Sequence, residues 1–138
     1  MSPGGEAVGR LSDVILDCPD LDEEARFWSA VLGLEVDESS RDRDWVSLAP
    51  AEGGLRLSFQ LVSDYRPPQW PEQEVPQQLH LDIAVSDLDS AESRLLRLGA
   101  RRSRYQPGLE GPNASGTFRV YLDPADHPFC LILDQTVD

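Results

Sequence analysis

Residues 80–89 read His-Leu-Asp-Ile-Ala-Val-Ser-Asp-Leu-Asp, and residues 13–22 already show the same order of apolar strand, turn and acidic helix start. The match continues beyond these stretches, because a Leu-Gly pair closes the helical segment that follows each of them. Residues 47–57 and 121–131 also correspond, near the end of each copy. Self-similarity of this kind indicates a duplicated unit whose two copies fold alike.

The first copy reads as a strand, a helix and three further strands. Residues 11–18 alternate as a strand, and Asp20 with Glu23 forms a capping box ahead of apolar residues at helical spacing. Gly33 supplies the left-handed end of that helix. We expect the charged run 37–44 to be a turn. The three later strands are expected at residues 34–36, 45–48 and 55–62.

The second copy repeats this plan after a linker. Residues 63–78 contain four prolines, which oppose both a helix and a central strand. Within this linker, Tyr65 and Trp70 either fold back as a lid over a cleft or anchor the linker to the surface. The helix of the second copy is expected to begin after Asp87. Its strands are expected at residues 80–85, 100–105, 118–122 and 129–133.

A chain of 138 residues is long enough for one domain built from two half-size modules. Such modules share one core. The expected segments are a loose N-terminal tail (1–10), the first βαβββ module (11–62), the Pro-rich linker (63–78) and the second βαβββ module (79–138).

The composition is that of a globular protein with an unusually negative charge. A net charge of -13 disfavours binding to nucleic acid and to anionic membrane surfaces, and it attracts cationic ligands. No apolar run approaches the roughly 20 residues that span a bilayer, and no signal peptide is visible. The two cysteines, Cys18 and Cys130, lie in apolar strands, so we expect a reduced, cytoplasmic protein.

Missing residue types narrow the possible chemistry. All 12 basic residues are arginine, so no lysine is present to form a Schiff base. The chain has two histidines, His80 and His127, which excludes a mechanism that needs three. We interpret His127, in a turn after Asp126, as a surface residue.

Four motifs together resemble the vicinal oxygen chelate superfamily of glyoxalases, bleomycin-resistance proteins and extradiol dioxygenases. They are Pro-Asp-Leu-Asp at 19–22, Phe-Trp at 27–28, His-Leu-Asp at 80–82 and Asp-Pro at 123–124, and they look most like small bacterial glyoxalase-like members. The resemblance implies an α+β fold in which two tandem βαβββ modules curve their mixed sheets into a cup-shaped cleft. It also leads us to expect a homodimer.

The same resemblance implies where a metal would bind. In metal-dependent relatives the ligands come from the first and last strands of each module, which correspond here to Asp13, Arg56, His80 and Cys130. Arg56 cannot coordinate a cation, and Cys130 replaces an expected glutamate. Asp13, His80 and Cys130 suit zinc better than manganese. We therefore expect no cofactor, with a divalent metal (zinc, manganese, nickel or iron) as the alternative.

Strand parity and the resemblance together give a candidate ligand-binding face. Arg56 is expected to pair there with Asp13 or Asp82. Trp45 and Tyr105 offer surfaces on which an aromatic ligand can stack. The polar side chains expected to face the cup are Asp13, Asp17, Arg56, Gln60, His80 and Asp82.

Three functions follow from this pattern. A binding protein would hold a small cationic or aromatic compound in the acidic cup without a metal, and this is the function we expect. A glyoxalase-type lyase or isomerase, or a dioxygenase, would use a metal on His80 and Asp13 with Asp82 as base. Without metal, His80 would act as base and Arg56 would stabilise an oxyanion. A protein whose sheet faces only dimerise is the third possibility.

Overall fold

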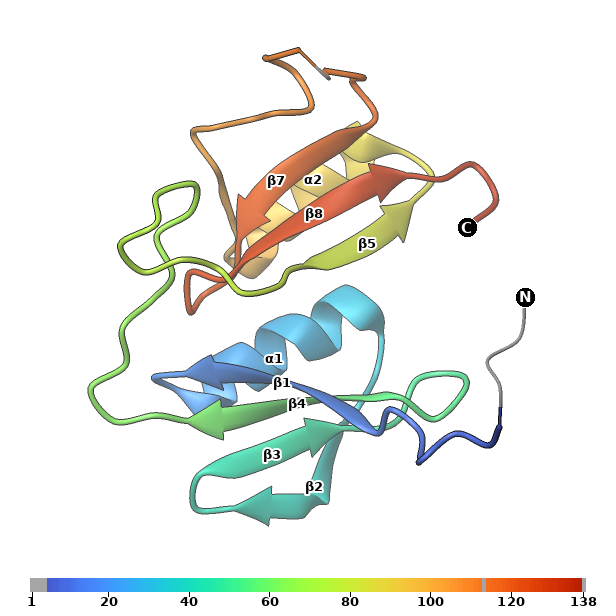
Figure 1. The fold of residues 1–138 in the computed structure, drawn as a ribbon, viewed down its shortest axis with the longest axis vertical. Coiled ribbons are helices and arrows are strands. Elements are labelled where there is room, and N and C mark those ends of the chain that lie inside the picture. Colours follow the sequence, from blue (N-terminus) through green and yellow to red (C-terminus); the bar gives the residue numbers. More distant parts are fainter. Residues whose placement is uncertain (1–4, 113, 138) are drawn as a thin grey trace.

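The computed structural model describes residues 5–112 and 114–137, which form two modules with the same order of elements (Figure 1). The first module contains β1 (Asp13–Cys18), α1 (Leu21–Leu32), β2 (Val36–Asp42), β3 (Trp45–Leu48) and β4 (Arg56–Leu61). The second contains β5 (Leu81–Val85), α2 (Leu88–Leu98), β6 (Arg101–Arg102), β7 (Phe118–Leu122) and β8 (Pro128–Leu133). The linker, residues 63–78, contains neither helix nor strand.

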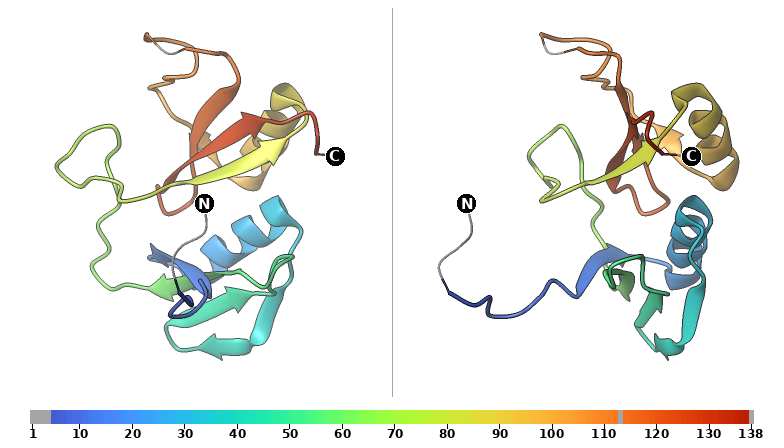
Figure 2. Two further views of the ribbon diagram at one scale, coloured as in Figure 1. Left: turned by 45° about the vertical axis from the view of Figure 1, so that its right-hand side comes forward. Right: turned by 90° about the vertical axis from the view of Figure 1, so that its right-hand side faces the viewer.

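Each module has its own four-stranded mixed sheet, in the orders β1-β4-β3-β2 and β5-β8-β7-β6. The first strand of each module pairs in parallel with the last one, and the other neighbours are antiparallel. Both helices lie on one side of the curved sheets, while the linker lies on the opposite side (Figure 2). The α+β fold expected from the sequence, with two βαβββ modules, is therefore confirmed.

Local sequence sets the helix boundaries. Asp20 and Asp87 each accept a backbone N–H from the first helical turn at 3.0 Å, which caps the two helices. Gly33 and Gly99 end them with φ angles of 67° and 110°, a left-handed conformation that glycine adopts without strain. Within the described residues, neither helix is long and apolar enough to cross a membrane.

Three expected elements are wrong in extent. The strand expected at 34–36 begins only at Val36 and continues to Asp42. Most of the charged run 37–44 is strand β2 and not a turn, because it pairs with β3 at the edge of the sheet, where charged side chains reach solvent. The strand expected at 100–105 shrinks to Arg101–Arg102. Beyond these two residues, the side chain of Gln106 forms hydrogen bonds with the backbone of Val120. It donates to the Val120 carbonyl at 2.7 Å and accepts from the Val120 N–H at 2.9 Å.

Aromatic side chains join the two modules. The ring of Phe129 on β8 lies 4.9 Å from Trp28 on α1 and 5.9 Å from Tyr121 on β7, measured between ring centroids. Phe27 approaches Phe129 at 6.0 Å. All four side chains are buried, so the first helix and the second sheet share one apolar core.

A buried polar contact lies beside this cluster. The indole Nε1 of Trp28 donates to Asp123 at 2.9 Å and to Glu24 at 3.3 Å, although both carboxyl groups are almost fully inaccessible to solvent. Burial, and then the proximity of Asp123, raises the pKa of Glu24 to about 10. Glu24 therefore keeps its proton at neutral pH.

Replacing Phe129 with alanine should lower the free energy of unfolding by about 3–5 kcal/mol, because it empties the centre of the core that both modules share. Leu133→Ala, on the same strand but partly exposed, should cost about 1 kcal/mol or less. Urea denaturation of the two variants measures the difference. Equal costs would contradict a shared core centred on Phe129.

Glu24→Gln should remove a pH dependence of stability. The pKa of Glu24 is about 10 in the folded state, against an ordinary value of 4.5, so the folded chain binds an extra proton between these values. Wild-type stability should therefore fall as the pH rises across this range, by up to about 1.4 kcal/mol per unit.

The amide of the Glu24→Gln variant imitates the protonated acid, so its stability curve should be flatter and should lie above that of the wild type at alkaline pH. Glu23→Gln, on the exposed side of the same helix, is the control. Urea unfolding from about pH 5 to about pH 9 tests this. Parallel curves for wild type and Glu24→Gln would show that Glu24 does not hold the proton.

Candidate functional site

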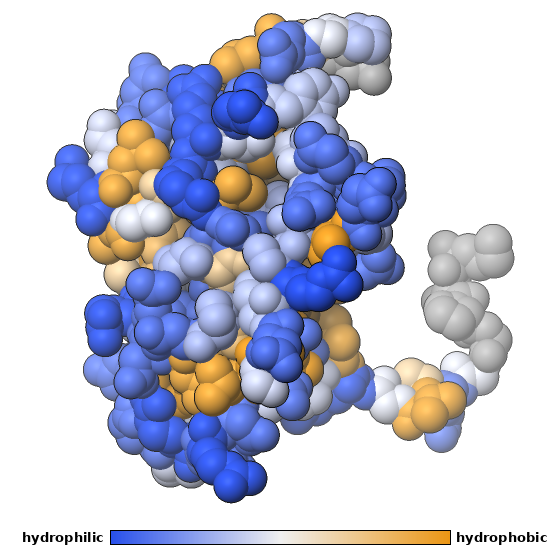
Figure 3. Space-filling model, turned by 90° about the vertical axis from the view of Figure 1, so that its left-hand side faces the viewer, coloured by the Kyte–Doolittle hydropathy of each residue, from blue (hydrophilic) through white to orange (hydrophobic). Residues whose placement is uncertain are grey.

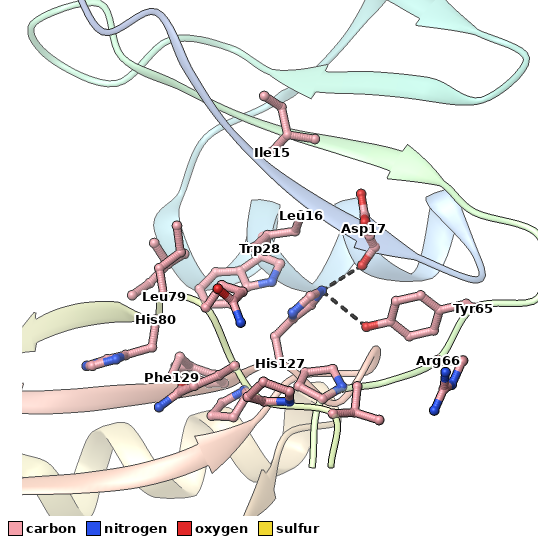
Figure 4. A pocket seen from close by; sticks show the side chains of 17 residues that line it. Ile15, Leu16, Asp17, Trp28, Tyr65, Arg66, Leu79, His80, His127 and Phe129 are labelled. Atoms are coloured by element: carbon pink, nitrogen blue, oxygen red, sulfur yellow. Dashed lines mark hydrogen bonds between the residues drawn. The ribbon is translucent and has the colours of Figure 1, made fainter. Parts of the chain in front are cut away.

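A cavity of about 310 Å³ lies between the end of β1, the linker and the starts of β5 and β8 (Figure 4). A second space of about 140 Å³ adjoins it, between the linker and the face of the second sheet that turns away from α2. Both are lined by Gln77, His80, Pro128 and Phe129. We name these two lobes together the linker cavity.

Apolar side chains make up most of the walls. The larger lobe is lined by Ile15, Leu16, Trp28, Val75, Leu81 and Phe129, among others. The smaller lobe is lined by Trp70, Pro107, Phe118, Val120 and Cys130 in addition to the four shared residues. Apolar walls with a few polar groups are typical of sites for small organic molecules. On the outer surface of the molecule, seen from the side on which the linker lies, apolar patches are separated by hydrophilic side chains (Figure 3).

One end of the larger lobe carries a polar group that bridges the modules. The Nε2 atom of His127 lies 2.6 Å from the backbone oxygen of Asp17 and 3.3 Å from the hydroxyl of Tyr65 (Figure 4). Tyr65 donates to the carbonyl of Ala125 at 2.7 Å, and burial raises its pKa, so the phenol stays protonated. His127, interpreted from sequence as a surface residue, is half-buried in this wall.

The turn before β8 fixes the position of His127. One carboxylate oxygen of Asp123 accepts the backbone N–H groups of both Ala125 and His127 at 2.9 Å. Its other oxygen accepts from Trp28, as described above. The buried contact between the modules therefore also sets one wall of the linker cavity.

Three potential metal ligands meet at the smaller lobe. One ligand atom from each of His80, Asp82 and Cys130 lies within 4.8 Å of the others. Asp82 is directly opposite Cys130 in the β5–β8 pairing, and its Oδ1 lies 3.4 Å from His80 Nε2. Burial, and then the charge of Asp82, raises the pKa of the Cys130 thiol to about 12.

The donors of this group fit a borderline divalent ion such as zinc. They comprise one imidazole nitrogen, one carboxylate oxygen and one sulfur, and two of the three residues also line the cavity. Three protein ligands with an open position are the arrangement of catalytic zinc sites. A bound cation would also offset the charge of Asp82, which adds to the effect of burial in raising the pKa of the Cys130 thiol.

A second group of Glu24, Asp123 and His127 has ligand atoms equally close together. Its carboxylates, however, already accept from Trp28 and from the backbone of the turn. We therefore assign this group to the contact between the modules.

The polar side chains on the first sheet form hydrogen bonds with one another. Ser58 donates to Asp13 at 2.9 Å and lies 2.8 Å from Ser47, whose hydroxyl accepts from Trp45 Nε1 at 3.2 Å. Hydrogen bonds from Ser12 and Ser58 lower the pKa of Asp13. Both Ser47 and Ser58 are buried, so these groups satisfy one another.

The candidate residues from the sequence are thus divided between two places. His80, Asp82 and Cys130 meet on the second sheet, and Asp17 lines the larger lobe. Arg56 pairs with Asp37 at 3.4 Å, where Asp13 or Asp82 was expected. Four candidates lie on the first sheet and line neither lobe: Asp13, Trp45, Arg56 and Gln60.

The linker contributes two residues to the walls of the smaller lobe, Trp70 and Gln77. Trp70 lines the smaller lobe, and its ring lies 5.4 Å from that of Tyr105. This placement agrees with the lid alternative for Trp70. Gln77 faces both lobes, and no pattern in the sequence marks it.

Comparison with known proteins agrees with this architecture. Residues 13–132 match the family described as glyoxalase-like domain. No curated protein matches the chain. A glyoxalase/bleomycin resistance protein/dioxygenase family enzyme from Burkholderia phytofirmans PsJN has a similar structure, with a TM-score of 0.65 and 19% identity over 89% of this chain and 97% of that one.

Two further solved structures are similar. Oxidase ChaP-H2 has a TM-score of 0.61 and 22% identity over 93% of this chain and 95% of its own. The fosfomycin resistance protein FosX from Mesorhizobium loti has a TM-score of 0.60 and 15% identity over 93% and 94%. At these identities the likeness concerns the fold. With the family match over most of its length, the chain belongs to the glyoxalase-like domain family.

Proposed function

We propose that this chain binds a small, partly aromatic organic molecule in the linker cavity. The observation that carries the proposal is the combination of apolar walls with polar groups, His80 and Gln77, where the two lobes meet. A volume of about 310 Å³ for the larger lobe is within the range of small-molecule sites. Trp70, fixed against Tyr105, adds an aromatic surface on which a flat ligand can stack.

The charge of the chain favours some ligands over others. A net charge of -13 repels anions over the whole surface and attracts cations. We therefore infer that the ligand is neutral or cationic. The homodimer and the cytoplasmic location expected from the sequence remain predictions.

A metal-assisted reaction is the second candidate, favoured by the grouping of His80, Asp82 and Cys130 beside the smaller lobe. These residues would hold the ion, which would polarise a carbonyl or hydroxyl oxygen of a bound molecule. The chain would then be a glyoxalase-type lyase or isomerase, or a dioxygenase. The protein's own part would be to orient the ligand against Phe129 and to exclude water beneath the linker.

Trp70→Ala should weaken the binding of small aromatic compounds by about three- to tenfold, because a stacking surface is lost. Trp45→Ala is the matched control, since Trp45 lies on the first sheet and lines neither lobe. Ligand-observed NMR titration with indole, tryptamine and benzoate measures the effect. We expect wild type to bind indole and tryptamine in preference to benzoate.

The opposite pattern would locate the site elsewhere. If Trp45→Ala weakened binding and Trp70→Ala did not, the first sheet would hold the ligand. If none of the three compounds bound to wild type, the proposed aromatic ligand class would be wrong.

Titration with cobalt(II) under reducing conditions tests the metal site. Wild type should give a thiolate-to-cobalt absorption band, which Cys130→Ser abolishes and His80→Ala weakens strongly. Asp13→Ala should leave the band intact, because Asp13 lies outside the group.

The cobalt affinity should also depend on pH. The pKa of Cys130 is raised to about 12, so the ion must displace the thiol proton, and affinity should rise with pH by up to about tenfold per unit. A band that survives in Cys130→Ser, or one that is lost in Asp13→Ala, would contradict this ligand set.

A further inference from the structure

Gln77 has a buried side-chain oxygen without a hydrogen-bond partner in the described part of the chain. The residue lies near the end of the linker and lines both lobes of the linker cavity. Leaving such an acceptor unpaired is costly, so a buried carbonyl oxygen normally finds a donor. Its position at the junction of the lobes makes a ligand the natural source of that donor.

The residues that line both lobes together with Gln77 explain why the protein itself supplies no donor. Pro128 lacks a backbone N–H, and the side chain of Phe129 is apolar. His80 is the one polar side chain among them, and its Nε2 lies 3.4 Å from the carboxylate of Asp82. Within the described residues, no protein donor reaches the Gln77 oxygen.

The linker backbone holds Gln77 in this position. Gln69 donates its N–H to the carbonyl of Val75 at 2.7 Å, which closes the loop that precedes Gln77. Pro76 then restricts the backbone immediately before it. The side chain of Gln77 is thus held at the cavity wall by a constrained segment, which is the preorganisation that a specificity-determining residue needs.

We propose that Gln77 selects ligands that carry an N–H or O–H group on an aromatic ring, by accepting a hydrogen bond from that group. This inference rests on the proposed function and narrows its ligand class. The flat ring would lie against Phe129 and Trp70, while the donor would point to the Gln77 oxygen. A cationic N–H donor would form the stronger bond and would suit the charge of the chain.

The first test needs no ligand. Gln77→Met keeps the length of the side chain and removes the unpaired oxygen, so it should raise the Tm of the empty protein. Gln73→Met is the matched control, because Gln73 is exposed on the same linker and lines neither lobe. A lower Tm for Gln77→Met would show that the carboxamide has a structural role, and it would overturn the inference.

The second test compares 3-methylindole with 1-methylindole, which have the same size and differ in whether the ring nitrogen carries a hydrogen. Wild type and Gln73→Met should bind 3-methylindole about fivefold more tightly, the ratio expected for one neutral hydrogen bond. In Gln77→Met the ratio should fall to about one. Isothermal titration calorimetry of the three proteins with the two compounds gives the six affinities.

Each outcome decides a different claim. Equal binding of the two isomers by wild type, or a preference that persists in Gln77→Met, would overturn the role of Gln77 while leaving the proposed binding function intact. Absence of binding by both isomers in wild type would overturn the proposed aromatic ligand class, and this inference with it.

Discussion

The hydrogen bond from Trp28 on α1 to the buried carboxylate of Asp123 connects the two modules, and Trp28 also donates to Glu24 on its own helix. Two buried carboxyl groups this close are tolerated when one of them holds its proton, and burial and the proximity of Asp123 raise the pKa of Glu24 to about 10. Both oxygens of Asp123 accept hydrogen bonds, from Trp28 and from the backbone of the turn. Asp123 also fixes the turn that carries His127. The same interaction therefore joins α1 to the second sheet, aligns the aromatic core and shapes one wall of the linker cavity.

Duplication has produced two sheets with the same topology but different surfaces. On the first sheet, the chain from Asp13 through Ser58 and Ser47 to Trp45 pairs the polar groups with one another. On the second sheet, the linker covers the equivalent face and leaves a space above Cys130. Some of the polar residues that resemble a binding site in the sequence are thus already hydrogen-bonded within the first sheet, while the space for a ligand lies over the second module.

Local signals predicted the framework, and long-range contacts determined the site. Caps at Asp20 and Asp87 marked both helix starts, since capping depends on neighbouring residues. In the sequence repeat, His80 corresponds to Asp13 and Cys130 to Arg56. Asp13 does pair with Arg56 in the first sheet, but Cys130 pairs with Asp82, two residues after His80. A shift of two residues leaves the side chains on the same face of the sheet. The path of the linker depends on contacts such as Tyr65 with Ala125, far apart in sequence, so periodicity did not reveal Gln77 or His127 as cavity residues.

The central claim is that a ligand binds beneath the linker and not on the polar face of the first sheet. Crystals of the wild-type protein soaked with small aromatic fragments, such as indole, test it most directly. We expect bound fragments to lie between Gln77, His80 and Phe129. Fragments found repeatedly beside Asp13 and Arg56, with the linker cavity empty, would contradict it.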